Sequence, residues 1–164
     1  MLIVHDTYFH WMHRLMHHPK LFKRVHLIHH KSTNPSPWPA YALHPFEGFL
    51  EALIIPILAF SIPIHGASLG TFFLFQIIYN VYGHLGFELY PNGFHKTWIG
   101  KWVNTYVAHN LHHDKFNGNC GLYFLFCNRL MGTLRTEYDE THKTVTTKES
   151  SPATKVAVSI SSPS

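Results

Sequence analysis

Residues 46–64 read FEGFLEALIIPILAFSIPI, and this stretch decides the fold that we expect. Its only charged residues, Glu47 and Glu51, lie near its start. As a helix, the stretch would extend about 28 Å, close to the thickness of the hydrocarbon core of a bilayer. A second apolar run, LGTFFLFQIIYNVYG at residues 69–83, follows a turn at residues 63–67. This pattern predicts a transmembrane helical hairpin, with a buried hairpin in a soluble helical protein as the alternative.

Basic residues flank the predicted hairpin on both sides, and the turn between its helices carries none. By the positive-inside rule, both flanks should therefore lie on the cytosolic side of the membrane. The expected location is an integral membrane protein of the endoplasmic reticulum in a eukaryote, or of the inner membrane in a bacterium. The flanking basic residues are Arg14, Lys20, Lys23, Arg24 and Lys31 before the hairpin, and Lys96, Lys101, Lys115, Arg129 and Arg135 after it.

Helical patterns on either side of the hairpin complete an all-α fold. We expect helices over residues 6–24 with a bend at Pro19, and over 21–31, 101–113 and 124–132. Residues 140–164 are rich in Thr, Ser and Lys and predict a disordered tail, which leaves one domain at residues 1–139. Cys120 and Cys127 are expected to be buried thiols in a reducing compartment, because they lack the close pairing of a zinc motif.

Histidines carry the clearest functional signal, because eight of the sixteen fall into three clusters with helical spacing. Side chains three or four residues apart share one helix face, so each cluster should point its imidazoles in one direction. Imidazole suits Zn, Cu, Fe and Ni, and eight imidazoles exceed the need of one tetrahedral zinc ion. Two metal ions are therefore predicted, against the alternative of polar helix faces or adventitious sites. The clusters are His13 and His17; His26, His29 and His30; and His109, His112 and His113.

Further residues could complete such a centre. His84 stands at the end of the second apolar run, one turn before Glu88, and the residues alone favour a ligand and a structural role equally. His10 lies one helical turn before His13 on the same face. Ligating imidazoles need an acceptor that orients their second nitrogen, and Asp6, Glu47, Glu88 and Asp114 are the available carboxylates.

The charged side chains are scattered along the chain and sum to a net charge of +4, which gives little support to nucleic-acid binding.

Five segments of the chain resemble the fatty acid hydroxylase superfamily, and specifically its sterol desaturase-like branch. The order and spacing of these segments match the family over roughly residues 5–138. The segments are HDTYFHWMHRLMHHPKLFKRVHLIHH at 5–30, ALHPFEGFLE at 42–51, NVYGHLGFE at 80–88, NTYVAHNLHHDKFNGNCGLYFLF at 104–126 and NRLMGTLR at 128–135.

The resemblance implies an integral membrane enzyme with two iron ions facing the cytosol. Such enzymes use O₂ and electrons from an external donor protein, of the cytochrome b5 or ferredoxin type, to hydroxylate or desaturate lipids. His44 also matches a family histidine, either as a ligand or as a residue that supports one. Carried over by motif position, the metal ligands would be His13, His17, His26, His29, His30, His84, His109, His112 and His113.

Three departures from the family pattern accompany the resemblance. Family members carry one or two membrane helices before the first histidine cluster, whereas Met1 lies close to that cluster here, which predicts a form shortened at its N-terminus. His10 stands where the family usually has an aromatic residue. Cys127 and Asn128 replace a Trp-Asp pair.

The sequence therefore predicts a membrane-bound non-haem diiron oxidoreductase that uses O₂ to desaturate or hydroxylate a lipid, with a sterol-type lipid as the first choice. A fatty acyl or sphingolipid hydroxylase is the alternative within enzymes. A catalytically silent membrane fragment that binds metal, with zinc in a purified form, and a soluble histidine-rich metal buffer are alternatives of other classes.

Overall fold

The computed structural model describes residues 1–31 and 37–149, and helices form all of its regular structure in these ranges. The only β contact in the described ranges is an isolated bridge between Val103 and Phe124, so the predicted all-α class is confirmed. The α-helices are α1 (Leu2–Met16), α2 (Pro19–Val25), α3 (Leu27–His30), α4 (Pro45–Ala52), α5 (Ile54–Ser61), α6 (Gly66–Gly83), α7 (Tyr106–Lys115), α8 (Phe126–Leu130) and α9 (Tyr138–Glu149). Short 3-10 helices are η1 (Trp38–Tyr41), η2 (Phe94–Lys96) and η3 (Gly100–Trp102).

The first histidine-rich segment folds as three helices rather than as one bent helix followed by another. His18 takes an extended conformation and caps α2, with its Nδ1 accepting a hydrogen bond from the Lys20 N–H at 3.4 Å. Pro19 occupies the first position of α2, where its missing N–H costs nothing. The chain therefore changes direction between His13 and His26, and this turn brings the first two histidine clusters face to face.

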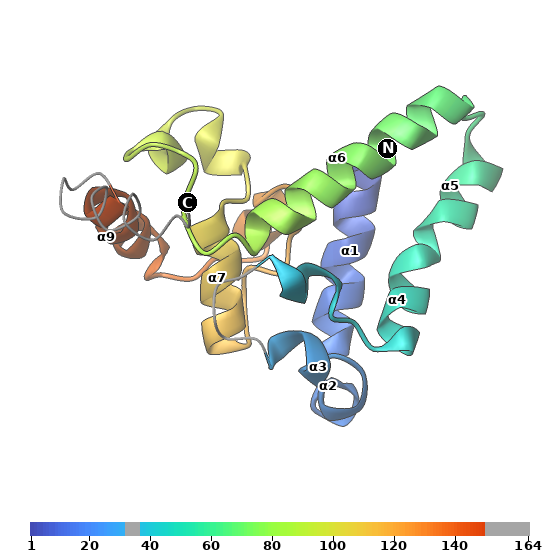
Figure 1. The fold of residues 1–164 in the computed structure, drawn as a ribbon, viewed down its shortest axis with the longest axis horizontal. Helices are drawn as coiled ribbons and strands as arrows, with labels where there is room; N and C mark the ends of the chain where they lie inside the picture. The colour runs from blue at the N-terminus through green and yellow to red at the C-terminus, as the bar shows by residue number, and fades with distance from the viewer. Residues whose placement is uncertain (32–36, 150–164) are drawn as a thin grey trace, which may run out of the picture.

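The predicted apolar hairpin is present as a helical hairpin, but its first arm is interrupted. Helix α4 ends at Ala52 and α5 begins at Ile54, because Pro56 has no N–H to donate to the Ala52 carbonyl. Figure 1 shows the arms meeting at the turn between α5 and α6 and then diverging, with α6 crossing α1 in this view. Within the described ranges, no helix combines the length and the apolar character needed to cross a membrane.

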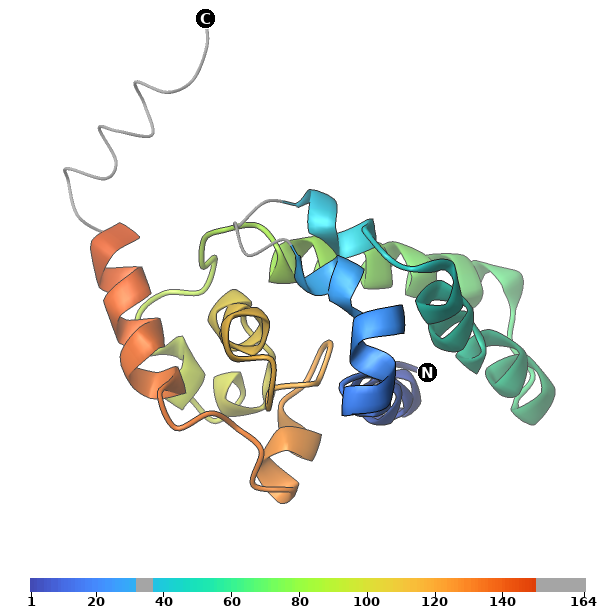
Figure 2. The same cartoon turned by 90° about the horizontal axis from the view of Figure 1, so that it is seen from below.

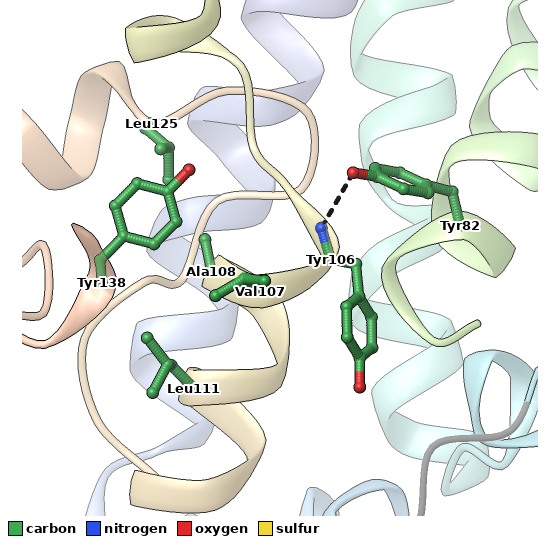
Figure 3. Packing of buried hydrophobic residues seen from close by; sticks show 7 residues of the cluster. All are labelled: Tyr82, Tyr106, Val107, Ala108, Leu111, Leu125 and Tyr138. Carbon is green, nitrogen blue, oxygen red and sulfur yellow. Dashed lines mark hydrogen bonds between the residues drawn. The ribbon is translucent and has the colours of Figure 1, made fainter. Parts of the chain in front are cut away.

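The hydrophobic core is built around α7 and includes residues of α6 and α9. Tyr138, at the start of α9, packs there with residues of α7 and with Leu125, as Figure 3 shows. Figure 2 shows α7 between α9 on one side and α1–α3 on the other. The core cluster comprises Tyr82, Tyr106, Val107, Ala108, Leu111, Leu125 and Tyr138.

Helix α9 corrects the expectation of a disordered tail from residue 140. Residues 140–149 are helical, since Tyr138, His142 and Thr146 recur at intervals of four and bury one face of the helix. The rest of the predicted tail, residues 150–164, lies outside the described ranges. Cys120 and Cys127 are buried free thiols, so the predicted burial is confirmed.

Candidate metal centre

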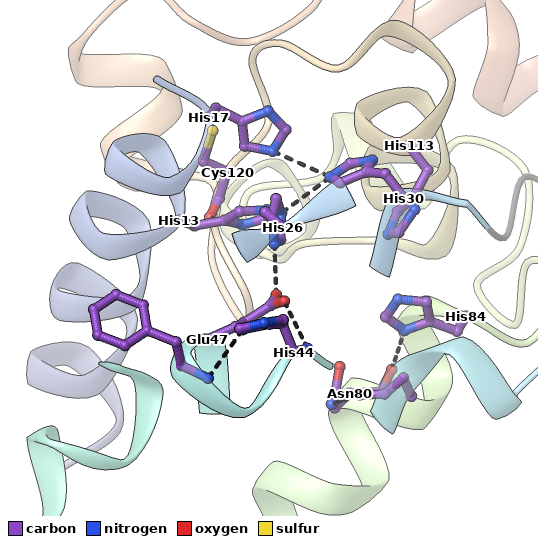
Figure 4. Close-up of polar contacts among 12 residues, drawn as sticks. His13, His17, His26, His30, His44, Glu47, Asn80, His84, His113 and Cys120 are labelled. Carbon is purple, nitrogen blue, oxygen red and sulfur yellow. Dashed lines mark hydrogen bonds and ion pairs between the residues drawn. The ribbon is translucent and has the colours of Figure 1, made fainter. Parts of the chain in front are cut away.

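The nine histidines that the sequence predicts as ligands come together in two adjacent groups. Each histidine offers one ring nitrogen, and within a group these nitrogens all lie within 4.8 Å of one another. Figure 4 shows several of these imidazoles facing a common space. The first group is His13, His17, His26, His30 and His112; the second is His29, His84, His109 and His113.

Each of the two clusters of three histidines, at residues 26–30 and 109–113, contributes side chains to both groups. This differs from the expectation that the three imidazoles of such a triplet point in one direction. On an α-helix, positions i and i+4 are 40° apart, whereas position i+3 lies 60° away on the other side of i. His26 and His30 therefore belong to the first group, while His29 belongs to the second. Likewise His109 and His113 share the second group, and His112 turns to the first. Histidines with the spacing His-x-x-His-His therefore supply ligands to two neighbouring sites rather than to one.

Fixed hydrogen-bond acceptors orient three imidazoles of the first group. His26 Nδ1 lies 2.5 Å from Glu47 Oε1, and His112 Nδ1 lies 2.7 Å from the Gly118 carbonyl oxygen. His13 Nδ1 lies 3.3 Å from the Cys120 carbonyl oxygen. A carbonyl oxygen only accepts, so Nδ1 of His13 and of His112 carries the proton and Nε2 of each presents a lone pair. Glu47 has the same effect on His26 when its carboxyl group is ionised. Lone pairs of these imidazoles therefore point into the first group.

The same arrangement occurs once in the second group. His84 Nδ1 lies 2.8 Å from the Asn80 carbonyl oxygen, one turn earlier on α6. His84 Nε2 then faces His109 Nε2 at 3.1 Å, and His113 Nε2 lies 3.2 Å from His109 Nε2. In the first group, His30 Nε2 lies 3.0 Å from His26 Nε2 and 3.1 Å from His17 Nε2.

Ring nitrogens that converge in this way are better suited to bind a metal ion than to hydrogen-bond to one another. His13 Nε2 and His112 Nε2 are buried and have no hydrogen-bond partner among the described residues. Unpaired buried nitrogen lone pairs cost free energy, and a cation placed between them removes that cost. A group whose ligand atoms are imidazole nitrogens, without oxygen, suits iron, zinc or copper rather than magnesium or calcium.

Burial keeps these imidazoles neutral, which is the form that binds a metal. It lowers the pKa of His26 and of His113 to about 2 and the pKa of His17 to about 4, against a usual value of 6.5. For His29 and His109, burial followed by the neighbouring imidazoles holds the pKa well below 6.5.

Of the four carboxylates that could orient a ligand, Glu47 contacts one. Asp6 instead accepts hydrogen bonds from the backbone N–H groups of residues 122–124, at 3.0, 2.6 and 3.3 Å, and ties α1 to the segment before α8. Glu88 accepts from the Tyr82 hydroxyl and from the Val107 N–H at the start of α7. Asp114 is exposed and pairs with Lys115. Asp6 and Glu88 therefore position ligand-bearing helices rather than ligands.

His10 and His44 lie outside both groups. His10 is fully buried one turn before His13, and neither of its ring nitrogens has a hydrogen-bond partner among the described residues. His44 caps α4, where its Nδ1 accepts from the Phe46 N–H at 3.2 Å while Glu47 Oε2 accepts from the His44 N–H. His44 thereby fixes the helix turn that carries Glu47 to His26.

Sequence reasoning missed the backbone carbonyls that orient His13, His84 and His112. The Gly118 carbonyl reaches His112 because the chain reverses after α7, where Phe116, Gly118 and Asn119 all have positive φ angles of 60°, 71° and 48°. The asparagine and glycine in Phe116-Asn-Gly-Asn119 were the available signal for such a reversal.

The two groups differ in their access to solvent. His17 is only partly buried and borders a cavity of about 580 Å³ that is also lined by Arg14 and Phe116. All four histidines of the second group are buried.

Comparison with known proteins agrees with this geometry. A model of the family described as fatty acid hydroxylase matches residues 1–133. The chain belongs to the fatty acid hydroxylase family. The match includes all nine histidines of the two groups, and the family resemblance in the sequence is thereby confirmed.

Curated proteins similar to this chain include sterol enzymes of fungi and mammals. The chain is 29% identical to the Delta(7)-sterol 5(6)-desaturase ERG3B of Gibberella zeae, over 88% of this chain and 44% of that protein. It is 33% identical to ERG3A of the same organism, over 82% and 36%. Lathosterol oxidase of Homo sapiens is 30% identical, over 79% and 42%. The chain thus spans less than half the length of these relatives, and no solved structure matches it.

Proposed function

We propose that the protein is a membrane-bound non-haem diiron oxidoreductase that desaturates or hydroxylates a lipid, with a sterol as the first choice of substrate. The observation that carries this proposal is the convergence of nine neutral imidazoles in two adjacent groups. Five nitrogens would hold one iron and four the other. When bound, the irons would supply the reduction of O₂ and the oxidation of an unactivated C–H bond.

The role of this chain's own residues follows from the site. Glu47 holds the proton on His26 Nδ1, and the carbonyls of Cys120, Gly118 and Asn80 do the same for His13, His112 and His84. The protein thereby keeps the ligands in their binding tautomers before any metal arrives. All four histidines of the second group are buried, which limits the access of water to that group.

Electrons must come from outside the centre. Desaturation removes two hydrogen atoms from the lipid and reduces O₂ to two waters, which requires two further electrons and two protons. The described residues contain no flavin or nicotinamide fingerprint. A cytochrome b5- or ferredoxin-type carrier is therefore the proposed partner, and sterol-type relatives support the proposed lipid class.

Membrane association is part of the proposal and has support in the side chains of the hairpin. Large apolar residues on α4–α6 are exposed, including Phe60 at 93%, Phe49 at 58% and Leu74 at 59%. An exposed apolar surface of this kind marks an interaction with lipid or protein. The proposed orientation places the hairpin in the bilayer and the histidine groups on the cytosolic side.

Substitution of ligands in each group tests the proposal. His112→Ala in the first group and His29→Ala in the second should each lower iron content by about one ion per chain and abolish lipid oxidation. The measurements are metal analysis and lipid profiling of a host that expresses each variant. His65→Asn is the matched control, because His65 is exposed and asparagine preserves its capping of α6.

Two results would contradict the proposal. Full activity and iron content in His29→Ala would show that the centre is assigned to the wrong residues. Stable zinc with no turnover after iron reconstitution would favour a silent metal-binding protein.

A further inference from the structure

Two neighbouring cavities lie beside the histidine groups and share part of their lining. The inner one, about 10 Å³, has room for roughly one water-sized molecule and lies between the groups, lined by His13 of the first and His109 of the second. The outer one, about 280 Å³, opens between α1 and the helices of the hairpin. Four residues line both cavities, and we call the place where they lie the junction: Phe9, Leu43, Glu51 and Gln76.

The walls of the outer cavity are mostly apolar, with the imidazole of His5 on α1 among them, and two polar side chains lie at the junction. Ile54, Ile55 and Phe72 contribute apolar side chains from α5 and α6. Glu51 and Gln76 bring a carboxyl group and an amide to the end nearest the histidines. Neither side chain hydrogen-bonds to another residue of the described chain, although both are partly buried. Polar groups in an apolar passage cost free energy unless a partner binds them, so this pair points to a ligand that carries a polar group.

The sizes of the cavities determine which part of the ligand reaches the junction. About 280 Å³ is below the usual 300–1,000 Å³ of a site that encloses a whole small molecule, so only one end of a lipid fits. An apolar chain end at the junction would leave the carboxyl and amide unpaired. A hydroxyl group would satisfy both, since it donates one hydrogen bond and accepts others.

We propose that the lipid enters the outer cavity with a hydroxylated end first, and that Glu51 and Gln76 bind this hydroxyl group. The proposal rests on the proposed function and narrows its substrate class. The substrate is a compact lipid alcohol that is oxidised within a few bonds of its own hydroxyl. A long acyl chain oxidised far from its polar head is disfavoured, because a site built for a hydroxyl rejects a ligand that lacks one.

Binding of two matched probes tests this inference without turnover. The metal-loaded chain in lipid nanodiscs is titrated with tritiated cholestanol, and 5α-cholestane, which lacks only the hydroxyl group, serves as competitor. The wild-type protein should bind cholestanol about tenfold more tightly than cholestane, as expected for one or two hydrogen bonds. In Glu51→Leu and in Gln76→Leu the ratio should fall several-fold, and in the double variant it should approach one.

Thr71→Leu is the matched control for these variants. Thr71 is exposed on the same helix as Gln76, lines neither cavity and bonds only to its own helix through the Ala67 carbonyl. It should keep the wild-type ratio. Unchanged metal content and unfolding temperature establish that each variant is folded.

The inference is overturned if the wild-type protein does not prefer cholestanol, or if the double variant keeps the tenfold preference. Its failure is distinct from failure of the proposed function. A protein that oxidises lipids but shows no hydroxyl preference refutes the inference alone, whereas one that keeps the preference and oxidises no lipid refutes the proposed activity alone.

Discussion

At the scale of single residues, Glu47 is the side chain on which a ligand most visibly depends. Its carboxyl group contacts His26 Nδ1, and glutamine at this position keeps an acceptor oxygen but cannot ionise. We expect Glu47→Gln to lower metal affinity about tenfold and Glu47→Ala about 100-fold, the range found for groups that orient metal ligands. Metal bound per chain at limiting iron measures this.

Glu140→Gln provides the comparison for Glu47→Gln, since Glu140 is exposed on α9 and contacts no histidine of the centre. Equal metal affinity in the two glutamine variants would show that the Glu47–His26 contact does not tune the centre.

Much of the site could be predicted from the sequence because imidazole at helical spacing is a specific signal. All nine predicted ligands lie in the two groups. The division of each triplet was not predicted, since it depends on a 100° rotation between adjacent positions that the spacing rule ignores. The carbonyls of Asn80, Gly118 and Cys120 that orient ligands could not be predicted either. Every residue has a carbonyl, and only the folded structure determines which of them lies beside an imidazole.

At the scale of elements, the close approach of α6 to α7 positions the second group. Gly83 ends α6, and a Cβ atom added there would lie 3.2 Å from His109 Cδ2. Gly83→Ala should therefore displace His109 and reduce occupancy of the second group to about half or less, with no loss in the temperature of unfolding, because alanine favours helix. Metal content and thermal unfolding measure the two effects.

Gly70→Ala on the same helix separates displacement from helix propensity. A Cβ atom at Gly70 would meet nothing within 4 Å. If both variants kept full metal content, contact between α6 and His109 would not limit the site.

Element boundaries were less predictable than element types. Residues 46–64 were expected to form one long helix, but the structure has two helices there because the N–H that Pro56 lacks falls where α4 ends. Helix α9 was missed because its composition is polar, and its buried face becomes recognisable only once α7 is there to cover it.

At the scale of the whole molecule, the exposed apolar side chains of α4–α6 predict that the protein partitions into membranes rather than into solution. Phe60, Phe49 and Leu74 would be covered by lipid in the proposed orientation. We expect the full chain to sediment with membranes and to resist extraction by alkaline carbonate, measured by immunoblotting of the pellet and supernatant. Complete recovery in the supernatant would instead support a soluble metal buffer.

The partly buried His17 has a consequence for the whole centre. Because His17 faces a cavity of about 580 Å³ while every histidine of the second group is buried, a chelator can reach one metal position before the other. Removal of iron by dipicolinate should therefore proceed in two phases of similar amplitude, followed as iron released against time. Loss in a single phase would contradict this. The two positions would then differ in residence time, so that a half-loaded protein could be isolated and each position filled with a different metal.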